Sequence, residues 1–252
     1  MRKTNLNKIM TKGKAMFLAY DQGLEHGPVE FNDKNVDPRE IVKIAKEGKF
    51  NAVIFQKGIA EKYSEEIKKS KVPLIIKLNG KTNIRGGEPV STQICSVREA
   101  INLGALAVGY TIYLGSEYEP FMMKEFAKIE EEAHKIGIPV IVWVYPRGKG
   151  AEKRKKSELM AYSGRTGLEI GADIVKLGYN GSKKDLKWTV KSAGKTKVVI
   201  AGGTKTDEKN FLGQVRDIID AGGSGFAVGR NVWKAKDPIG LSKKIKKIIF
   251  GK

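Results

Sequence analysis

Short runs of β-branched and other apolar residues alternate with longer amphipathic segments along the whole of this sequence. Eight β-then-α units follow one another with no break in composition between them. This arrangement favours one closed parallel barrel over an open sheet with a second domain. The runs that predict strands are Ala15–Tyr20, Ala52–Phe55, Leu74–Leu78, Ala105–Tyr110, Val140–Tyr145, Ile174–Leu177, Val198–Ala201 and Gly225–Val228.

The intervening segments carry helix signals. Prolines suit the first turns of helices expected at Pro38–Lys46 and Pro120–Lys135, and a further helix is expected at Asp207–Ala221. Glycines shortly before the next strand predict left-handed helix caps, at Gly48, Gly104, Gly137, Gly171 and Gly222.

The length of 252 residues suits a single (β/α)8 TIM barrel, so residues 1–252 are expected to form one catalytic domain of the α/β class. A doubly wound sheet is the alternative. That fold would carry a GxGxxG turn after its first strand, and residues 20–28 contain none.

The composition bears on the cellular compartment that we expect for this protein. The single cysteine, Cys95, cannot form an internal disulfide, and the sequence shows neither a signal-peptide pattern nor an apolar run long enough to span a bilayer. We therefore expect a soluble, cytoplasmic protein with no membrane partner.

The formal charge of +19 suits either a nucleic acid or a small anionic substrate. The lysines are spread over most helices, with small basic clusters at residues 153–156 and 243–247, and no basic stretch is interleaved with aromatic residues. A solvated surface explains this pattern, and a nucleic-acid partner is not expected. A nucleic-acid-binding barrel without catalysis stays as the alternative, which would require an affinity that survives physiological salt.

Side chains of a barrel strand point alternately inward and outward, and the last inward residue opens onto the catalytic face. On the sixth strand, Lys176 shares the inward face with Ile174, whereas Val175 faces the helices. The same alternation places Trp143 and Tyr145 of the fifth strand inside the barrel. Asp21, after the first strand, is expected to reach the same mouth.

A buried lysine is disfavoured in its charged form, so its pKa falls and its amine can attack a carbonyl to form an iminium. Tyr145 can move protons at this centre, and Asp21 can orient hydroxyl groups or assist deprotonation. Two alternatives stay open: Lys176 could form a purely structural ion pair with Asp21 or Asp173, or Lys77 at the end of the third strand could be the nucleophile.

Glycine-rich turns follow the last two strands, in Ala201-Gly202-Gly203-Thr204 and Val228-Gly229-Arg230-Asn231. Barrels bind phosphate at this place through backbone N–H groups, and Arg230 adds a guanidinium for an oxyanion. The pair of turns predicts a phosphate site.

The two histidines and one cysteine offer no metal-site spacing, so no metal and no cofactor is expected. His26 follows the first strand close to Asp21 and is a candidate site residue. His134 is expected on the solvent side of a helix.

With those residues in place, the sequence resembles the archaeal class I fructose-1,6-bisphosphate aldolase family over nearly its whole length. The matching stretches are Leu18-Ala19-Tyr20-Asp21, Glu25-His26-Gly27-Pro28, Gly58-Ile59-Ala60-Glu61-Lys62-Tyr63, Leu78-Asn79-Gly80-Lys81-Thr82, Val108-Gly109-Tyr110-Thr111-Ile112-Tyr113, Trp143-Val144-Tyr145-Pro146-Arg147-Gly148 and Val228-Gly229-Arg230-Asn231-Val232-Trp233.

The resemblance implies reversible cleavage of fructose 1,6-bisphosphate to dihydroxyacetone phosphate and glyceraldehyde 3-phosphate in glycolysis and gluconeogenesis. It implies a Schiff base on Lys176, proton transfer by Tyr145, and a site shaped by Trp143 and Asp21. It further implies assembly into ring-based decamers. The substrate-binding residues that it implies are His26, Arg147, Ala201, Gly202, Gly203, Gly229 and Arg230, of which the glycines and Arg230 hold the phosphate of the dihydroxyacetone-phosphate half.

One residue departs from the family pattern: Gln22 stands where the family usually has histidine, and it is included among the expected substrate-binding residues. A sister family with the same barrel and lysine makes an amino-dideoxy heptulosonate in a transaldol reaction. Its members tend to lack the Glu-His-Gly-Pro run, so residues 25–28 favour the aldolase, and the heptulosonate synthase is the alternative.

Overall fold

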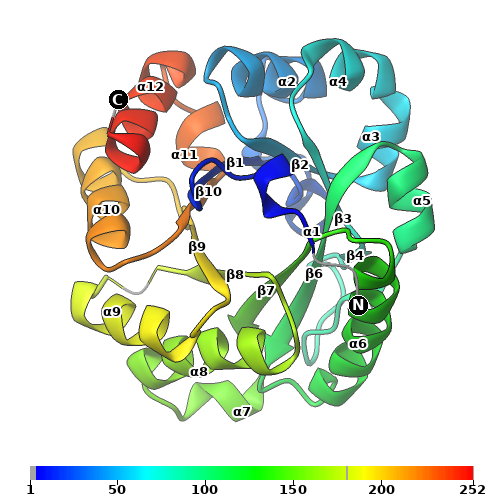
Figure 1. Cartoon of the computed structure of the whole chain (residues 1–252), viewed down its shortest axis with the longest axis vertical. Helices are drawn as coiled ribbons and strands as arrows, with labels where there is room; N and C mark the ends of the chain where they lie inside the picture. Colours follow the sequence, from blue (N-terminus) through cyan, green and yellow to red (C-terminus); the bar gives the residue numbers. More distant parts are fainter. Residues whose placement is uncertain (1–3, 180, 252) are drawn as a thin grey trace.

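The structure, a computed structural model, describes residues 4–179 and 181–251, so residues 1–3, 180 and 252 of the predicted 1–252 domain lie outside the described residues. Eight parallel strands form a closed barrel with helices around it (Figure 1), which confirms the predicted fold class. In their order around the barrel, the strands are β1 (Ala15–Ala19), β10 (Gly225–Val228), β9 (Lys197–Ala201), β8 (Ile174–Gly178), β7 (Val140–Pro146), β6 (Ala105–Leu114), β3 (Leu74–Lys77) and β2 (Ala52–Gln56).

The connecting segments are mostly helical. None of the helices within the described ranges is both long and apolar enough to cross a membrane. The helices are η1 (Leu6–Lys8), α1 (Gly23–His26), η2 (Gly27–Glu30), α2 (Pro38–Glu47), α3 (Lys57–Lys62), α4 (Ser64–Ser70), α5 (Val97–Asn102), α6 (Glu119–Lys135), α7 (Lys149–Glu152), α8 (Lys156–Glu169), α9 (Lys183–Ser192), α10 (Glu208–Asp220), α11 (Arg230–Trp233) and α12 (Pro238–Phe250).

The expected helix starts are close to the observed ones. Pro38 begins α2, and the carboxylate of Asp37 before it accepts a hydrogen bond from the backbone N–H of Arg39. Asp207 lies one residue outside α10 and caps it by accepting from the N–H of Asn210. Such side-chain caps satisfy backbone donors that have no partner within the helix.

The alternation predicted for the strands is confirmed by two separate hydrophobic clusters. Phe17, Ile141, Trp143 and Ile174 belong to the cluster inside the barrel. Their neighbours along the strands, such as Val175, pack in the larger cluster between the sheet and the helices. Each large apolar side chain buried in this way stabilises the fold by roughly 1.5–3 kcal/mol.

Strand β6 is longer than the sequence indicated and runs ten residues, to Leu114 rather than to Tyr110. Its last residues pair with β7, where Tyr113 lies opposite Tyr145. After β3, a small antiparallel sheet of β4 (Asn79–Gly80) and β5 (Thr92–Gln93) also went unpredicted, because strands of two residues leave no periodic signal.

Four of the five predicted glycine caps have positive φ: Gly104, Gly137, Gly171 and Gly222. The prediction for Gly48 was wrong. Its φ is −74°, and Lys49 takes the left-handed conformation instead, with φ of +54°. A Cβ at position 48 would lie 2.8 Å from Cβ of Ser242 on α12, so the glycine permits close helix packing rather than a left-handed turn.

The expectation that His134 is solvated was also wrong. The residue is 8% exposed, and its ring lies between two carboxylates, with Nδ1 2.6 Å from Oε1 of Glu130 and Nε2 2.9 Å from Oδ2 of Asp173. Asp173 also accepts from the backbone N–H of Val140, at the start of β7. The histidine thus ties the last turn of α6 to the sheet, a contact that helix periodicity alone cannot reveal.

Candidate active site

A cavity of about 340 Å³ opens at the carboxyl ends of the barrel strands. The twelve residues expected at the site all line it, so the structure brings every one of them together. They are Asp21, Gln22, His26, Trp143, Tyr145, Arg147, Lys176, Ala201, Gly202, Gly203, Gly229 and Arg230. Lys77, Glu25 and Thr204 complete the polar lining. A larger cavity, of about 490 Å³, lies at the other end of the barrel, away from these groups.

Lys176 lies inside this mouth because β8 directs it inward. Its side chain is almost completely buried, and Nζ is 4.8 Å from the centre of the Trp143 ring. Burial lowers the pKa of Lys176 to about 8; the Asp21 carboxylate opposes this shift, and the positive charge of Lys77 adds to it. A substantial fraction of this amine is therefore neutral near neutral pH.

Asp21 forms its ion pair with Lys77, at 3.5 Å between Oδ2 and Nζ, and both side chains are buried. Burial alone would raise the pKa of Asp21, but the charges of Lys176 and Lys77 outweigh it, and the pKa lies below the ordinary value. Asp21 is thus a carboxylate that faces two lysines.

The structural alternative for Lys176 is not supported. Among the described residues, Lys176 forms no ion pair, and Asp173 is occupied by His134, Val140 and Thr4, whose hydroxyl donates to it at 2.6 Å. Lys77 rather than Lys176 carries the ion pair with Asp21. Lys176 is therefore the better candidate for the free amine.

Trp143 fits beside Lys176 because its indole ring packs against Gly109 of β6. A Cβ on Gly109 would collide with the indole ring. The indole Nε1 is buried and, within the described residues, has no hydrogen-bond partner. The same holds for Nε2 of Gln22, so two buried donors in the lining of one cavity are available for a ligand.

Tyr145 ends the inward row of β7. Burial raises its pKa, and the negative charges of Asp21 and Glu25 add to this effect against the opposing charge of Arg147. The guanidinium of Arg147 lies 5.5 Å from the ring centre. The Tyr145 hydroxyl is consequently held as a neutral phenol, which can donate a proton.

Glu25 also lines the site and was not among the residues predicted from the sequence, although it stands in the Glu-His-Gly-Pro run. Its carboxylate accepts hydrogen bonds from Arg147 at 2.8 Å and from the Tyr113 hydroxyl at 3.2 Å. Lys81 lies 4.0 Å away. Glu25 therefore holds Arg147 at the rim of the cavity, a role that only the folded contacts reveal.

His26, next in sequence, is partly buried at the rim. Burial lowers its pKa, and the positive charges of Arg230 and Arg147 do so too, against the opposing charge of Glu25. Its Nδ1 lies 3.1 Å from the amide nitrogen of Asn83. A neutral imidazole at this place can accept or donate a hydrogen bond to a substrate hydroxyl.

The two glycine turns after β9 and β10 face each other. Gly203 has φ of +62°, and a Cβ on Gly229 would lie 2.9 Å from the carbonyl oxygen of Ala19. Asn231 ties the turns together, since its amide donates to the carbonyl oxygen of Gly202 at 2.9 Å. Glycine is therefore favoured at 203 by the backbone conformation and at 229 by the close approach of β1.

Arg230 has partners that the sequence did not suggest. Its Nη1 donates to Glu30 at 2.8 Å, and Nη2 donates to the carbonyl oxygen of Gly203 at 3.3 Å. Hydrogen bonds from Lys234 and Arg230 lower the pKa of Glu30 to about 2. The guanidinium is thereby fixed at the edge of the glycine turns.

Within residues 4–179 and 181–251, no group of three or more His, Cys, Asp or Glu side chains could hold a metal ion. The groups that the cavity does bring together are an amine, a phenol and a carboxylate, beside two glycine turns.

Known proteins resemble this chain over most of its length. The DeoC/LacD family of aldolases matches residues 15–235. Fructose-bisphosphate aldolase class 1 of Thermoproteus tenax is 47% identical over 243 residues, which cover 95% of this chain and 91% of that protein. The Halobacterium salinarum protein of the same name is 42% identical over 252 residues, covering 99% and 95%.

A solved structure adds the chemistry of a relative. An archaeal fructose-1,6-bisphosphate aldolase, with its catalytic lysine covalently bound to the carbinolamine intermediate of the substrate, is 44% identical and superposes with a TM-score of 0.91, covering 98% of each chain. The resemblance noted in the sequence is thus confirmed over almost the full length. The chain belongs to the DeoC/LacD family of aldolases, together with the archaeal class 1 fructose-bisphosphate aldolases.

Proposed function

We propose that this chain cleaves fructose 1,6-bisphosphate reversibly to dihydroxyacetone phosphate and glyceraldehyde 3-phosphate through a Schiff base on Lys176. One observation carries the proposal: a buried lysine without an ion pair, its pKa lowered to about 8, lies in the same cavity as a phenol, a carboxylate and two glycine turns. The names of the relatives at 42–47% identity support it and do not favour the heptulosonate synthase alternative.

The first steps form the iminium. The neutral amine of Lys176 adds to C2 of the open-chain ketose. The former carbonyl oxygen receives one proton from the nitrogen and one from an acid, for which the neutral phenol of Tyr145 is placed, and it leaves as water. The iminium that remains is positively charged beside the Asp21 carboxylate and the face of Trp143, and both stabilise a cation.

The next steps cleave the carbon–carbon bond. The C4 hydroxyl loses its proton as the C3–C4 bond breaks, and the bonding electrons move into the iminium to give an enamine. Glyceraldehyde 3-phosphate leaves, C3 of the enamine takes up a proton, and water hydrolyses the new iminium to release dihydroxyacetone phosphate. Tyr145 is the proposed proton carrier, and the free donors of Gln22 and Trp143 are placed to bind substrate oxygens.

The proposal is tested by comparing two reactions of the purified protein in excess EDTA. We expect cleavage of fructose 1,6-bisphosphate to both trioses, read by coupled reduction of the products. The transaldol alternative would also release glyceraldehyde 3-phosphate, but it would pass the three-carbon enamine to aspartate semialdehyde, so little free dihydroxyacetone phosphate would form. Loss of cleavage that zinc restores would contradict the Schiff-base mechanism.

The rate of cleavage should depend on pH through the protonation of the Lys176 amine. With a pKa near 8 in place of the ordinary 10.5, about a tenth of Lys176 is neutral at pH 7, against roughly one part in three thousand. We expect kcat/KM for cleavage to rise about tenfold per pH unit below pH 8 and to level above it. A rise that continues to pH 10 would show that the lysine is not perturbed.

The phosphate role of Arg230 is tested with two substrates. Arg230→Ala should lower kcat/KM for fructose 1,6-bisphosphate by about tenfold or more, because charge-assisted hydrogen bonds contribute about 1.5–3 kcal/mol each, but should change little for unphosphorylated fructose. Lys234→Ala is the matched control, since Lys234 shares Glu30 with Arg230 but does not line the cavity. Equal losses for both sugars would make Arg230 a structural residue.

Assembly and location stay predictions. The resemblance to the archaeal class I aldolase family, with relatives at 42–47% identity, supports association of this chain with copies of itself. Light scattering on the purified protein would distinguish the expected ring-based decamer from smaller assemblies. Participation in glycolysis and gluconeogenesis, a cytoplasmic location and the expected lack of a nucleic-acid partner are proposed on the same family basis.

A further inference from the structure

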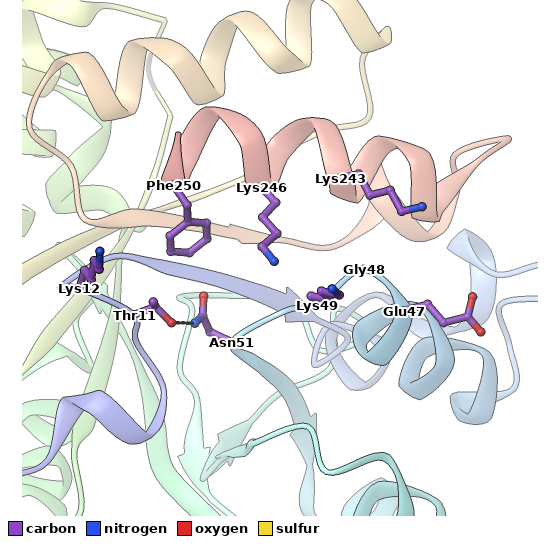
Figure 2. Close-up of a pocket in the computed structure, with 9 residues that line it drawn as sticks. All are labelled: Thr11, Lys12, Glu47, Gly48, Lys49, Asn51, Lys243, Lys246 and Phe250. Atoms are coloured by element: carbon purple, nitrogen blue, oxygen red, sulfur yellow. Dashed lines mark hydrogen bonds between the residues drawn. The ribbon is translucent and has the colours of Figure 1, made fainter. Parts of the chain in front are cut away.

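A second cavity, of about 490 Å³, lies at the amino-terminal end of the barrel. Thr11 and Lys12 of its wall precede β1, and Asn51 precedes β2, whereas the active-site residues follow the strands. The end of α2 with the two residues after it forms a second part of the wall. The third part is α12, from which Lys246 and Phe250 project toward Thr11 and Asn51 (Figure 2). The cavity is therefore separate from the aldolase site.

The lining of this cavity is strongly basic. Lys12, Lys49, Lys243 and Lys246 contribute four positive charges, and Glu47 is the one acidic group among the described lining residues. Within the described part of the chain, none of the four lysines forms an ion pair, although neighbouring Lys244 does, with Glu208. Cations gathered around a cavity without carboxylate partners repel one another, and a bound polyanion would relieve that repulsion.

Two of these lysines occupy backbone conformations that disfavour any side chain. Lys12, Lys49 and Lys71 are the described residues other than glycine with positive φ, and the first two line the cavity. Glycine would adopt φ of +50° or +54° at less cost, so lysine at both positions weakens the fold slightly. Backbone strain of this kind is concentrated at ligand-binding sites, and two of the three lysines with it lie together at this cavity.

The uncharged part of the lining suits a planar group. Phe250 presents a half-buried aromatic ring to the cavity (Figure 2). The floor is rigid, because the Asn51 side chain donates to the Thr11 hydroxyl at 2.9 Å and accepts from the backbone N–H of Met16 at 2.9 Å. An aromatic ring beside fixed polar groups and several lysines offers stacking to a base and charge to phosphates.

We propose that this amino-terminal cavity binds a nucleoside di- or triphosphate, with the phosphates on Lys12, Lys49 and Lys246 and the base against Phe250. The binding site is distinct from the aldolase centre and uses no residue of it. Cavities that hold ligands of this size are commonly about 300–1,000 Å³, and the volume of about 490 Å³ lies in that range.

The test measures binding of ATP, ADP, adenosine and tripolyphosphate to the whole protein by calorimetry at physiological salt. We expect ATP to bind at least about tenfold more tightly than tripolyphosphate, because stacking adds to the charge contacts. Phe250→Leu keeps an apolar side chain for packing, and it should weaken ATP but leave tripolyphosphate unchanged.

The most specific test replaces the two lysines of the cavity that have positive φ. Lys12→Gly combined with Lys49→Gly should weaken ATP binding by at least about tenfold while the melting temperature stays equal or rises, since both substitutions relieve strain. Lys71→Gly is the matched control, because it removes a lysine of the same conformation outside the cavity and should leave binding unchanged. Arg230→Ala, at the opposite end of the barrel, should also have no effect on it.

Several outcomes would overturn the proposal. One is no ATP binding at millimolar concentration, and another is binding that the double glycine variant retains. Tripolyphosphate that binds as tightly as ATP would leave Phe250 without a role. A single-stranded oligonucleotide that binds more tightly than ATP through the same lysines would make the cavity part of a nucleic-acid surface.

Discussion

Lys176→Met is expected to reduce cleavage of fructose 1,6-bisphosphate by a factor on the order of 10⁵ or more, because a lost nucleophile removes the covalent route altogether. In the wild-type protein, borohydride with dihydroxyacetone phosphate should add one ligand, located at Lys176 by mass spectrometry of the digested protein. The variant should add none.

Lys77→Met is the control for this experiment. Lys77 is equally buried and lies beside the same carboxylate, but it is ion-paired with Asp21, whereas Lys176 is not. The Lys77 variant should still trap the ligand at Lys176, although its activity will fall because Asp21 loses its partner. A covalent label found on Lys77 in the wild-type protein would reverse the assignment of the nucleophile.

Lys176→Met should also stabilise the fold. The pKa of Lys176 falls from 10.5 to about 8 on folding, so the buried charge disfavours the folded state by about 3 kcal/mol at most. That penalty is fully present below pH 8, and it fades as the pH rises toward 10.5 because the unfolded chain then loses the proton as well. Lys176→Met should therefore raise the free energy of unfolding by about 1–3 kcal/mol at pH 7, and by less at pH 10.

Tyr145→Phe is expected to lower kcat for cleavage by about 10²- to 10⁴-fold, the usual contribution of a positioned proton donor. The substitution removes only the hydroxyl, so the apolar packing of the ring and the approach of Arg147 persist. Since burial raises the pKa of this phenol, the wild-type profile should show no loss of activity from its ionisation in the neutral range. Rates of single-turnover cleavage would measure the change directly.

Tyr113→Phe is the matched variant for that measurement. Tyr113 lies opposite Tyr145 in the barrel register, but its hydroxyl donates to Glu25. Its loss should weaken the hold of Glu25 on Arg147 and raise KM more than it lowers kcat. Equal losses of kcat in the two variants would mean that Tyr145 acts through the hydrogen-bond network rather than on the substrate.

Much of the fold was accessible from the sequence because the signals are local. The two-residue alternation of β7 and β8 was enough to place Trp143, Tyr145 and Lys176 inside the barrel, and the glycine turns identified the mouth. The closed barrel followed from the number and order of the units. The twelve expected site residues line one cavity for the same reason, since they lie on the inward faces of strands or in the segments that follow the strands.

Contacts between distant segments were not accessible. Glu30 and Arg230 are separated by 200 positions, so nothing local indicates that one holds the other. His134 was assigned to solvent because its partner Asp173 lies 39 residues away. Lys176 and Lys77 are equally buried, and the one that lies nearer to Asp21 forms the ion pair. The alternation of side chains along a strand does not determine that distance.

The closed barrel constrains how the chain folds during its synthesis. Ala15 pairs with Gly225, so the hydrogen bonds that complete the sheet join segments 210 positions apart (225 − 15). During synthesis on a ribosome, β1 and β9 must keep exposed edges until residues 225–228 emerge. Since the second glycine turn follows this last strand, a nascent chain stopped before it would contain Lys176 but lack that turn. We therefore expect activity only after β10 has completed the barrel.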